Sequence, residues 1–352
     1  MHLPRALAAG ALAIAMPWSA GAAQDSSIVS RAVATATFHG FVEVYYRSGD
    51  PTTVDGYRLR KVDLKLAGVL SPHLLWRVGF DAAKVIGLSS ARDSAGGLTG
   101  VSLDQRGRPL QDAALTYVVN RALQIDAGQQ LLPLSLEGTI PAPQVETIER
   151  AMFIVERSRG TGMGDVRDIG VSLNGATTSG VEYHAGVFNE TGESQNTTDS
   201  NAQKAVIGRL VWHTSAIPGL QVGGSGAFEG GPPAQRRQRA GGETQYATPR
   251  VTVRAEAMAG TDGALRRLGW YALAAVRPTH ALQLVARADT WDRDLGAEQS
   301  VNDALERQIL AGASYAIDDG AGRVALNLVH QSFPNVSVPR ATFALVAFEA
   351  VW

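Results

Sequence analysis

Hydrophobic and polar residues alternate with a period of two along most of the chain. The segment RVTVRAEAM, Arg250–Met258, has valine or alanine at every second position and arginine, threonine or glutamate between them. A helix would scatter these charges around its axis, whereas successive side chains of a strand point to opposite faces. Leu282–Thr290 and Arg323–Gln331 repeat the pattern. The chain is therefore predicted to consist of short amphipathic strands.

Connections between these segments alternate in length. Short turns such as Ser71–His73 and Pro278–His280 alternate with longer polar loops such as Gly87–Pro109 and Gly260–Arg266. This is typical of an all-β, antiparallel up-and-down transmembrane β-barrel, with short periplasmic turns and long extracellular loops. The pattern leaves open whether Arg237–Tyr246 is a strand or a loop. With it, about sixteen strands are expected, at Thr37–Arg47, Tyr57–Val69, Leu74–Lys84, Leu110–Val119, Leu123–Leu131, Arg167–Ala176, Val181–Phe188, Lys204–His213, Leu220–Glu229, Arg237–Tyr246, Arg250–Met258, Arg267–Arg277, Ala281–Trp291, Glu306–Ile317, Arg323–Gln331 and Ala341–Trp352.

The first 22 residues, MHLPRALAAGALAIAMPWSAGA, have the pattern of a secretory signal peptide. Arg5 precedes an apolar stretch, and Ala20-Gly21-Ala22 supplies the small residues of a cleavage site. We therefore expect a signal peptide at 1–22, a periplasmic lead-in at 23–36 and the barrel at 37–352. This places the protein in the outer membrane of a Gram-negative bacterium after Sec-type export, in contact with outer-membrane lipids.

The last predicted strand reads ATFALVAFEAVW and is apolar at nearly every position. Phe348 and Trp352 fall on one apolar face, which we expect to contact lipid, while Glu349 falls on the other. Pairing of this strand with the first would remove both free edges. The terminal aromatic residue resembles the signal read by the outer-membrane assembly machinery, so Phe348 and Trp352 are candidate assembly residues.

Composition narrows the classes of function. The 352 residues include 32 basic and 33 acidic ones, for a net charge of -1, and no cysteine. A nucleic-acid partner would need a basic face, and disulfides and thiolate metal sites need cysteine. GTGMG at Gly160–Gly164 lacks the spacing of a phosphate-binding loop, and no HExxH motif occurs. We expect no catalytic residues, no metal, no cofactor and no enzymatic activity.

If the apolar faces contact lipid, the polar faces surround a water-filled lumen, which sixteen strands are enough to enclose. The predicted pore-lining cations are Lys61, Lys65, Arg77, Arg209, Arg254, Arg287 and Arg323. A soluble β-sandwich would alternate in the same way, and it remains an alternative at this stage.

The loop after the fifth strand, residues 132–165, is too long for a simple connection, and such loops tend to be functional. Its apolar residues Val145, Ile148, Met152 and Val155 have helical spacing. We expect this third external loop to contain a short helix, to fold into the barrel and to narrow the lumen. Its candidate constriction residues are Glu149, Arg150, Glu156, Arg157 and Arg159.

Three segments resemble the phosphate-selective porins O and P. YRLRKVDLKLAGVLSPHLLWRVGFD (Tyr57–Asp81) resembles that family's second and third strands. LQDAALTYVVNRALQIDAGQQLLPLSLE (Leu110–Glu137) and IERAMFIVERSRG (Ile148–Gly160) resemble its fourth and fifth strands and pore loop. The resemblance implies a homotrimeric outer-membrane channel with an inward third loop. It also implies that arginines along the lumen select anions such as phosphate. This chain has few lysines, however, and its loop contains acidic as well as basic residues.

The function expected from these observations is passive diffusion of small hydrophilic solutes, anionic or neutral, with a preference for anions. The alternative is an outer-membrane barrel enzyme or adhesin without an open pore.

Overall fold

The computed structural model describes residues 34–50, 55–84, 87–92, 98–104, 109–155, 163–164, 166–189, 204–232, 236–300 and 304–352. The expected signal peptide, 1–22, and most of the lead-in lie outside these residues. At the end of the lead-in, Thr35 Oγ1 accepts a hydrogen bond from Val69 N at 2.8 Å.

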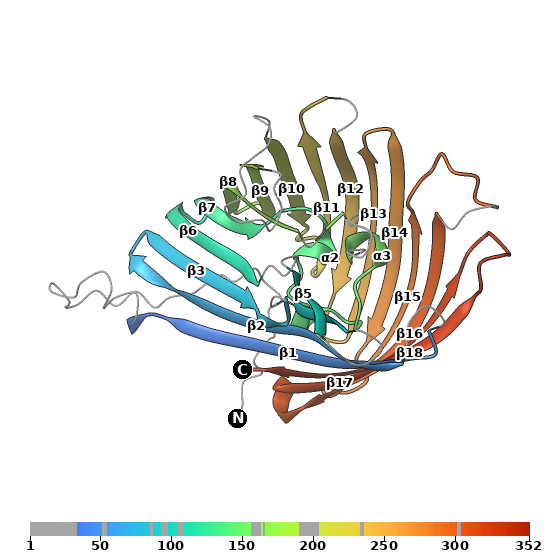
Figure 1. Ribbon diagram of the computed structural model, residues 1–352. Coiled ribbons are helices and arrows are strands. Elements are labelled where there is room, and N and C mark those ends of the chain that lie inside the picture. The colour runs from blue at the N-terminus through green and yellow to red at the C-terminus, as the bar shows by residue number, and fades with distance from the viewer. Residues whose placement is uncertain are drawn as a thin grey trace.

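Antiparallel strands form one closed barrel, in the order β1-β18-β17-β16-β15-β14-β13-β12-β11-β10-β9-β8-β7-β6-β3-β2 (Figure 1). The expected all-β barrel is confirmed, and Arg237–Tyr246 belongs to a strand. The wall strands are β1 Thr37–Ser48, β2 Gly56–Ser71, β3 Leu74–Asp81, β6 Leu110–Asn120, β7 Leu123–Leu131, β8 Arg167–Ala176, β9 Val181–Phe188, β10 Ala205–His213, β11 Leu220–Glu229, β12 Arg237–Ala247, β13 Val251–Asp262, β14 Leu265–Val276, β15 Leu282–Asp292, β16 Leu305–Ile317, β17 Gly322–Ser332 and β18 Ala341–Val351.

Three local expectations were wrong. The third strand ends at Asp81, and the non-alternating Ala82–Lys84 forms a 3₁₀ turn, η1. The expected loop Gly87–Pro109 contains a hairpin of β4 (Gly87–Arg92) and β5 (Leu98–Asp104), separate from the barrel sheet. The expected loop Gly260–Arg266 is a tight turn, because Gly263 takes a φ of 61°, a conformation open to glycine.

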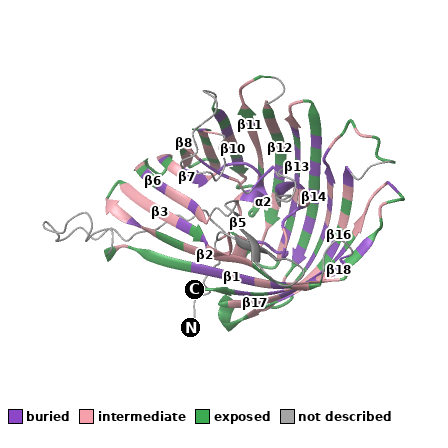
Figure 2. Cartoon of the chain, in the orientation of Figure 1, coloured by how far each residue is buried: buried purple, intermediate pink, exposed green. Residues whose placement is uncertain are grey.

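Inward and outward positions alternate in burial along the strands, as the banding in Figure 2 shows. In β14, Arg267, Tyr271 and Leu273 are buried on the inside, while Leu268 and Trp270 are exposed on the outside. Closure satisfies the backbone groups of every wall strand, which is the condition for strands to cross a bilayer. The outer face is thus apolar, and the charged face surrounds the interior.

The barrel closes where β1 pairs with β18. Glu43 lies opposite Glu349, and beyond the last pair Gly40 N donates to Trp352 O at 2.9 Å while Trp352 N donates to Gly40 O at 3.1 Å. The Trp352 indole lies over Gly40 so closely that a Cβ at residue 40 would lie 2.1 Å from the ring. Trp352 and Phe348 are exposed on the outer face, and Glu349 is buried on the inner face.

The long segment between β7 and β8 lies inside the ring of strands (Figure 1). It contains α2 (Leu136–Thr139), the 3₁₀ turn η2 (Ala142–Gln144) and α3 (Met152–Val155). The expected short helix is present as α3, but it contains only Met152 and Val155 of the four spaced residues, because Val145 is extended and Ile148 lies in a bend. Below, the segment from Leu132 to Val166 is called the inner loop. In the described part of the chain, no helix has the length and apolar character needed to cross a bilayer.

Candidate functional site

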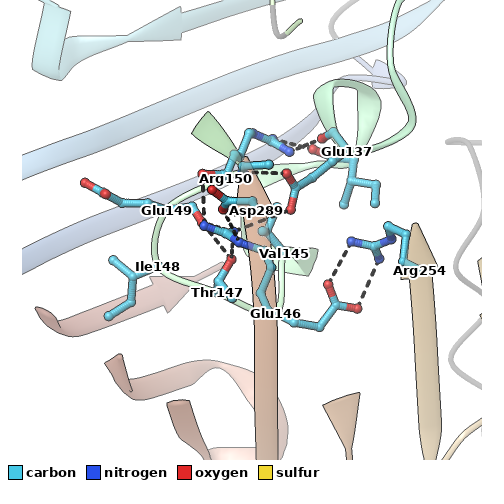
Figure 3. A network of polar contacts seen from close by, with 12 residues as sticks. Glu137, Val145, Glu146, Thr147, Ile148, Glu149, Arg150, Arg254 and Asp289 are labelled. Carbon is cyan, nitrogen blue, oxygen red and sulfur yellow. Dashed lines mark hydrogen bonds and ion pairs between the residues drawn. The ribbon is translucent and has the colours of Figure 1, made fainter. Parts of the chain in front are cut away.

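The inner loop is held against one side of the barrel by arginines that project from the wall. Arg254 on β13 makes two hydrogen bonds to the carboxylate of Glu146, at 3.0 and 3.1 Å (Figure 3). Their side chains are 3% and 5% exposed. A two-pronged arginine–carboxylate pair fixes orientation as well as distance, so this contact fixes the middle of the loop in place.

Arg287 on β15 makes the next contact. Its guanidinium donates to Thr147 Oγ1 at 2.9 Å and to the carbonyl oxygen of Glu149 at 2.7 Å, and it lies 2.8 Å from Asp289 Oδ2. The Arg287 side chain is 1% exposed. Removing one partner of such a buried pair typically costs about 3–5 kcal/mol, because the other charge is left without compensation.

Three further wall residues bind the same stretch of the loop. Arg323 on β17 donates to the Val145 carbonyl oxygen at 2.7 Å while it pairs with Glu349. Asn327 Oδ1 accepts from Ile148 N at 2.8 Å. Arg60 on β2 pairs with Glu43 at 2.8 Å and also donates to the Ile148 carbonyl oxygen. Backbone groups that a loop could not satisfy by itself are thus satisfied by the wall.

The beginning of the loop is anchored through the N-terminus of α2. Glu256 on β13 accepts from Leu136 N at 3.0 Å and Glu137 N at 3.2 Å, and Ser135 Oγ accepts from Gly138 N. A carboxylate at the first turn satisfies free N–H groups and complements their partial positive charge. The side chain of Glu137 in turn accepts from Ala151 N at 2.8 Å, which ties α2 to the residue before α3.

Apolar packing acts on the same side. Phe153 of α3 is fully buried, stacks on Tyr271 and packs against Trp291. The apolar cluster around it includes loop residues and inward residues of β1, β9–β11 and β13–β18, and no described residue of β2, β3, β6, β7 or β8. The inner loop therefore covers one side of the interior. Apart from the hydrogen bond of Arg60 on β2, the side formed by β2, β3, β6, β7 and β8 is left to charged and polar residues.

That second side, called the open wall, carries both signs of charge. Lys61 pairs with Asp63 at 3.3 Å, and Arg77 donates to Thr116 at 2.9 Å and lies 3.3 Å from Asp126. The acids are recessed: Asp63 is 7% exposed and Asp126 5%. The cations reach further, since Arg77 has a 34% exposed side chain and Lys65 is exposed.

Six of the seven predicted pore-lining cations thus fall into two groups. Lys61, Lys65 and Arg77 lie on the open wall, whereas Arg254, Arg287 and Arg323 lie under or beside the loop that they bind. Arg209 on β10 forms an ion pair with Glu243 on β12.

The constriction candidates are only partly described. Arg150 is buried and donates to the carbonyl oxygens of Glu137 and Ile140, so it braces the loop internally. Glu149 contributes its carbonyl oxygen to Arg287 and Thr147. Glu156, Arg157 and Arg159 lie outside the described residues.

Arg60 is an anchor that the alternation pattern did not identify. The register between β1 and β2 shifts between Glu43 and Val44, so that Lys61 faces Glu43 and Leu59 faces Val44, with Arg60 as the extra residue of a β-bulge. The sequence contains a trace of it: in YRLRKVDLK the charged residues change parity between Arg60 and Lys61. A change of parity inside a strand is the signal that could have found it.

A serine and a histidine meet on the inner face but do not form a hydrolytic pair. His184 Nε2 lies 2.9 Å from Ser172 Oγ. Ser172 Oγ also lies 3.0 Å from Gln130 Oε1, and Ser172 is buried, so the pair lacks the exposed hydroxyl that a hydrolytic nucleophile needs. Within the described ranges, no group of three His, Asp or Glu side chains has the geometry to hold a metal ion.

A closed sixteen-stranded barrel with an apolar exterior, a charged interior and a loop across part of that interior defines an outer-membrane pore. The chain belongs to the phosphate-selective porin O and P family, whose model matches residues 34–275. No curated protein sequence matches it.

Solved structures share the fold at low sequence identity. An anion-selective porin from Comamonas acidovorans is 13% identical with a TM-score of 0.62, covering 90% of this chain and 99% of its own. OmpF of Salmonella typhi, in complex with daunomycin, is 11% identical with a TM-score of 0.62, covering 90% and 97%. A trimer form of OmpT, an outer-membrane protein of Vibrio cholerae, is 10% identical with a TM-score of 0.59, covering 90% and 99%.

Proposed function

We propose that this porin is a passive diffusion channel for small hydrophilic solutes with a mild preference for anions, phosphate among them. The observation that carries the preference is the arrangement of charges on the open wall. Lys65 and Arg77 extend into the interior, while Asp63, Asp81 and Asp126 are recessed at the wall. A passing ion therefore meets the cations first, and charged side chains that line a pore set its selectivity.

The preference should be mild because the arginines that would strengthen it have other partners. Arg254, Arg287 and Arg323 are each paired with a carboxylate and bind the inner loop. Their side chains are 3%, 1% and 18% exposed, against 34% for Arg77, so they contribute less than Arg77 to the field in the lumen. The proposal therefore differs from a channel in which a continuous row of free arginines conducts phosphate.

Export by a Sec-type signal at residues 1–22, assembly into a homotrimer and the absence of enzymatic activity belong to the same proposal. The signal-like N-terminal sequence supports export, and the trimer form of a structural neighbour supports the oligomer. The burial of Ser172 beside His184 speaks against the alternative of a barrel hydrolase.

Reversal potentials in a KCl gradient test the anion preference. The wild-type channel is expected to be moderately anion-selective. The variant Lys65→Gln/Arg77→Gln should lose that preference or become cation-selective, because the recessed aspartates then dominate the open wall.

The matched control is Arg266→Gln/Arg307→Gln, which removes the same charge from the outer face and should leave the reversal potential unchanged. A cation-selective wild type, or equal shifts in both variants, would contradict the proposed role of the open wall.

A further inference from the structure

Two arginines on the outer face of the barrel have no partner among the described residues. Arg266 at the extracellular end of β14 and Arg307 at that of β16 are exposed and occupy outward positions of their strands. Outward positions elsewhere on these strands hold residues such as Trp270, Leu268 and Ile309. Basic side chains near the membrane surface attract anionic lipid groups, and no described residue pairs with these two.

The two arginines flank one region of the wall. Trp270 on β14 is paired with Thr290, which is paired with Arg307 on β16. Arg266 lies four residues before Trp270 on β14. With a rise of about 3.3 Å per residue and strands about 4.8 Å apart, the Cα atoms of Arg266 and Arg307 are roughly 16 Å apart. Two long side chains at that separation can bind one large head group from both sides.

Beside this pair the outer face is hollowed. A hollow of about 410 Å³ lies across β12–β14, and the outward residues that line it are Gly242, Thr244, Ala255, Ala257, Trp270 and Ala272. An added Cβ at Gly242 would meet no atom within 4 Å. Neighbouring β10 and β11 instead present Leu210, Trp212 and Phe228, each more than half exposed. The recess is thus a local feature, bounded on one side by an aromatic ring.

We propose that this face binds a phosphate-bearing lipid of the outer leaflet, with Arg266 and Arg307 on its phosphates and an acyl chain in the hollow beside Trp270. Guanidinium groups bind phosphate oxygens through two parallel hydrogen bonds. The described residues of β12 to β16 place no exposed carboxylate outward near these arginines. The site lies outside the lumen and is independent of which solute passes.

Binding of lipid A, a disaccharide with two phosphates and several acyl chains, to the detergent-solubilised full chain tests this site. Each arginine near an anionic lipid contributes about fivefold, so Arg266→Gln/Arg307→Gln should weaken binding about 25-fold. The matched control Arg121→Gln/Arg250→Gln removes two exposed charges from turns at the opposite rim and should bind as the wild type does. Phosphatidylethanolamine should bind weakly to all three proteins.

Two further measurements test whether a lipid, rather than free phosphate or a second copy of the chain, fills the hollow. Gly242→Leu fills the hollow and should also weaken lipid A binding, while inorganic phosphate at equal phosphate concentration should not compete. Unchanged lipid binding by the arginine variant would overturn the proposal. Full competition by inorganic phosphate would also overturn it, because the arginines would then be only a surface anion site. Loss of the oligomer in Gly242→Leu would overturn it as well, because the hollow would then bind a second copy of the chain.

Discussion

Replacing Arg254 and Arg287 together by alanine should increase single-channel conductance and make it noisy. Both arginines are buried and bind the inner loop, through Glu146 in one case and through Thr147 and the Glu149 carbonyl oxygen in the other. Each loss leaves carboxylates buried without compensation, at a cost of about 3–5 kcal/mol. The inner loop should then detach from the barrel wall for part of the time, which widens the cross-section of the lumen open to ions.

The control for this variant is Arg209→Ala, which removes an ion pair between two wall strands and no hydrogen bond or ion pair to the described part of the inner loop. It should leave the conductance steady. A charge exchange, Arg254→Glu with Glu146→Arg, should restore part of the wild-type behaviour because the pair is re-formed in reverse. Wild-type conductance in the double alanine variant would show that these arginines do not hold the loop.

A side chain at residue 40 should prevent closure of the barrel. In Gly40→Val the new Cβ would lie 2.1 Å from the Trp352 indole, at the point where the two terminal strands exchange their last hydrogen bonds. Overpacking costs about 1–3 kcal/mol, and strands that fail to pair also leave two open edges. The folded band of unheated protein on a gel, which runs apart from the heated band, measures the closed fraction after refolding in detergent.

The matched control is Gly56→Val, because an added Cβ at Gly56 meets no atom within 4 Å. It should refold like the wild type. Gly40→Val/Trp352→Ala should recover part of the folded fraction, since removal of the indole relieves the clash. Equal losses in both glycine variants would show that a side chain at either glycine, rather than the contact with Trp352, limits closure.

The strand pattern allowed the fold to be predicted in detail because each wall residue obeys one local rule. Inward and outward environments differ in polarity, so the period of two appears directly in the sequence, as in β13. Where the alternation breaks, the regular strand is interrupted or ends. The parity change at Arg60 is a bulge, and the non-alternating Ala82–Lys84 is a turn.

The site was less predictable because it depends on contacts between distant residues. An inward arginine has the same sequence signature whether water or a loop covers it. Arg77 and Arg254 therefore have the same signature in the sequence. What separates them is that Arg254 binds Glu146 of the inner loop, 108 residues away along the chain. Asn327 gave no signal at all, since its role is one hydrogen bond to Ile148 N.

Single-channel recording of the purified, refolded wild-type protein in planar lipid bilayers tests the central claim most directly. Discrete conductance steps that scale with KCl concentration are expected, because ions would cross a water-filled lumen beside the open wall. Folded protein, verified by its gel shift, that inserts without any conductance would contradict the assignment of this barrel as an open pore.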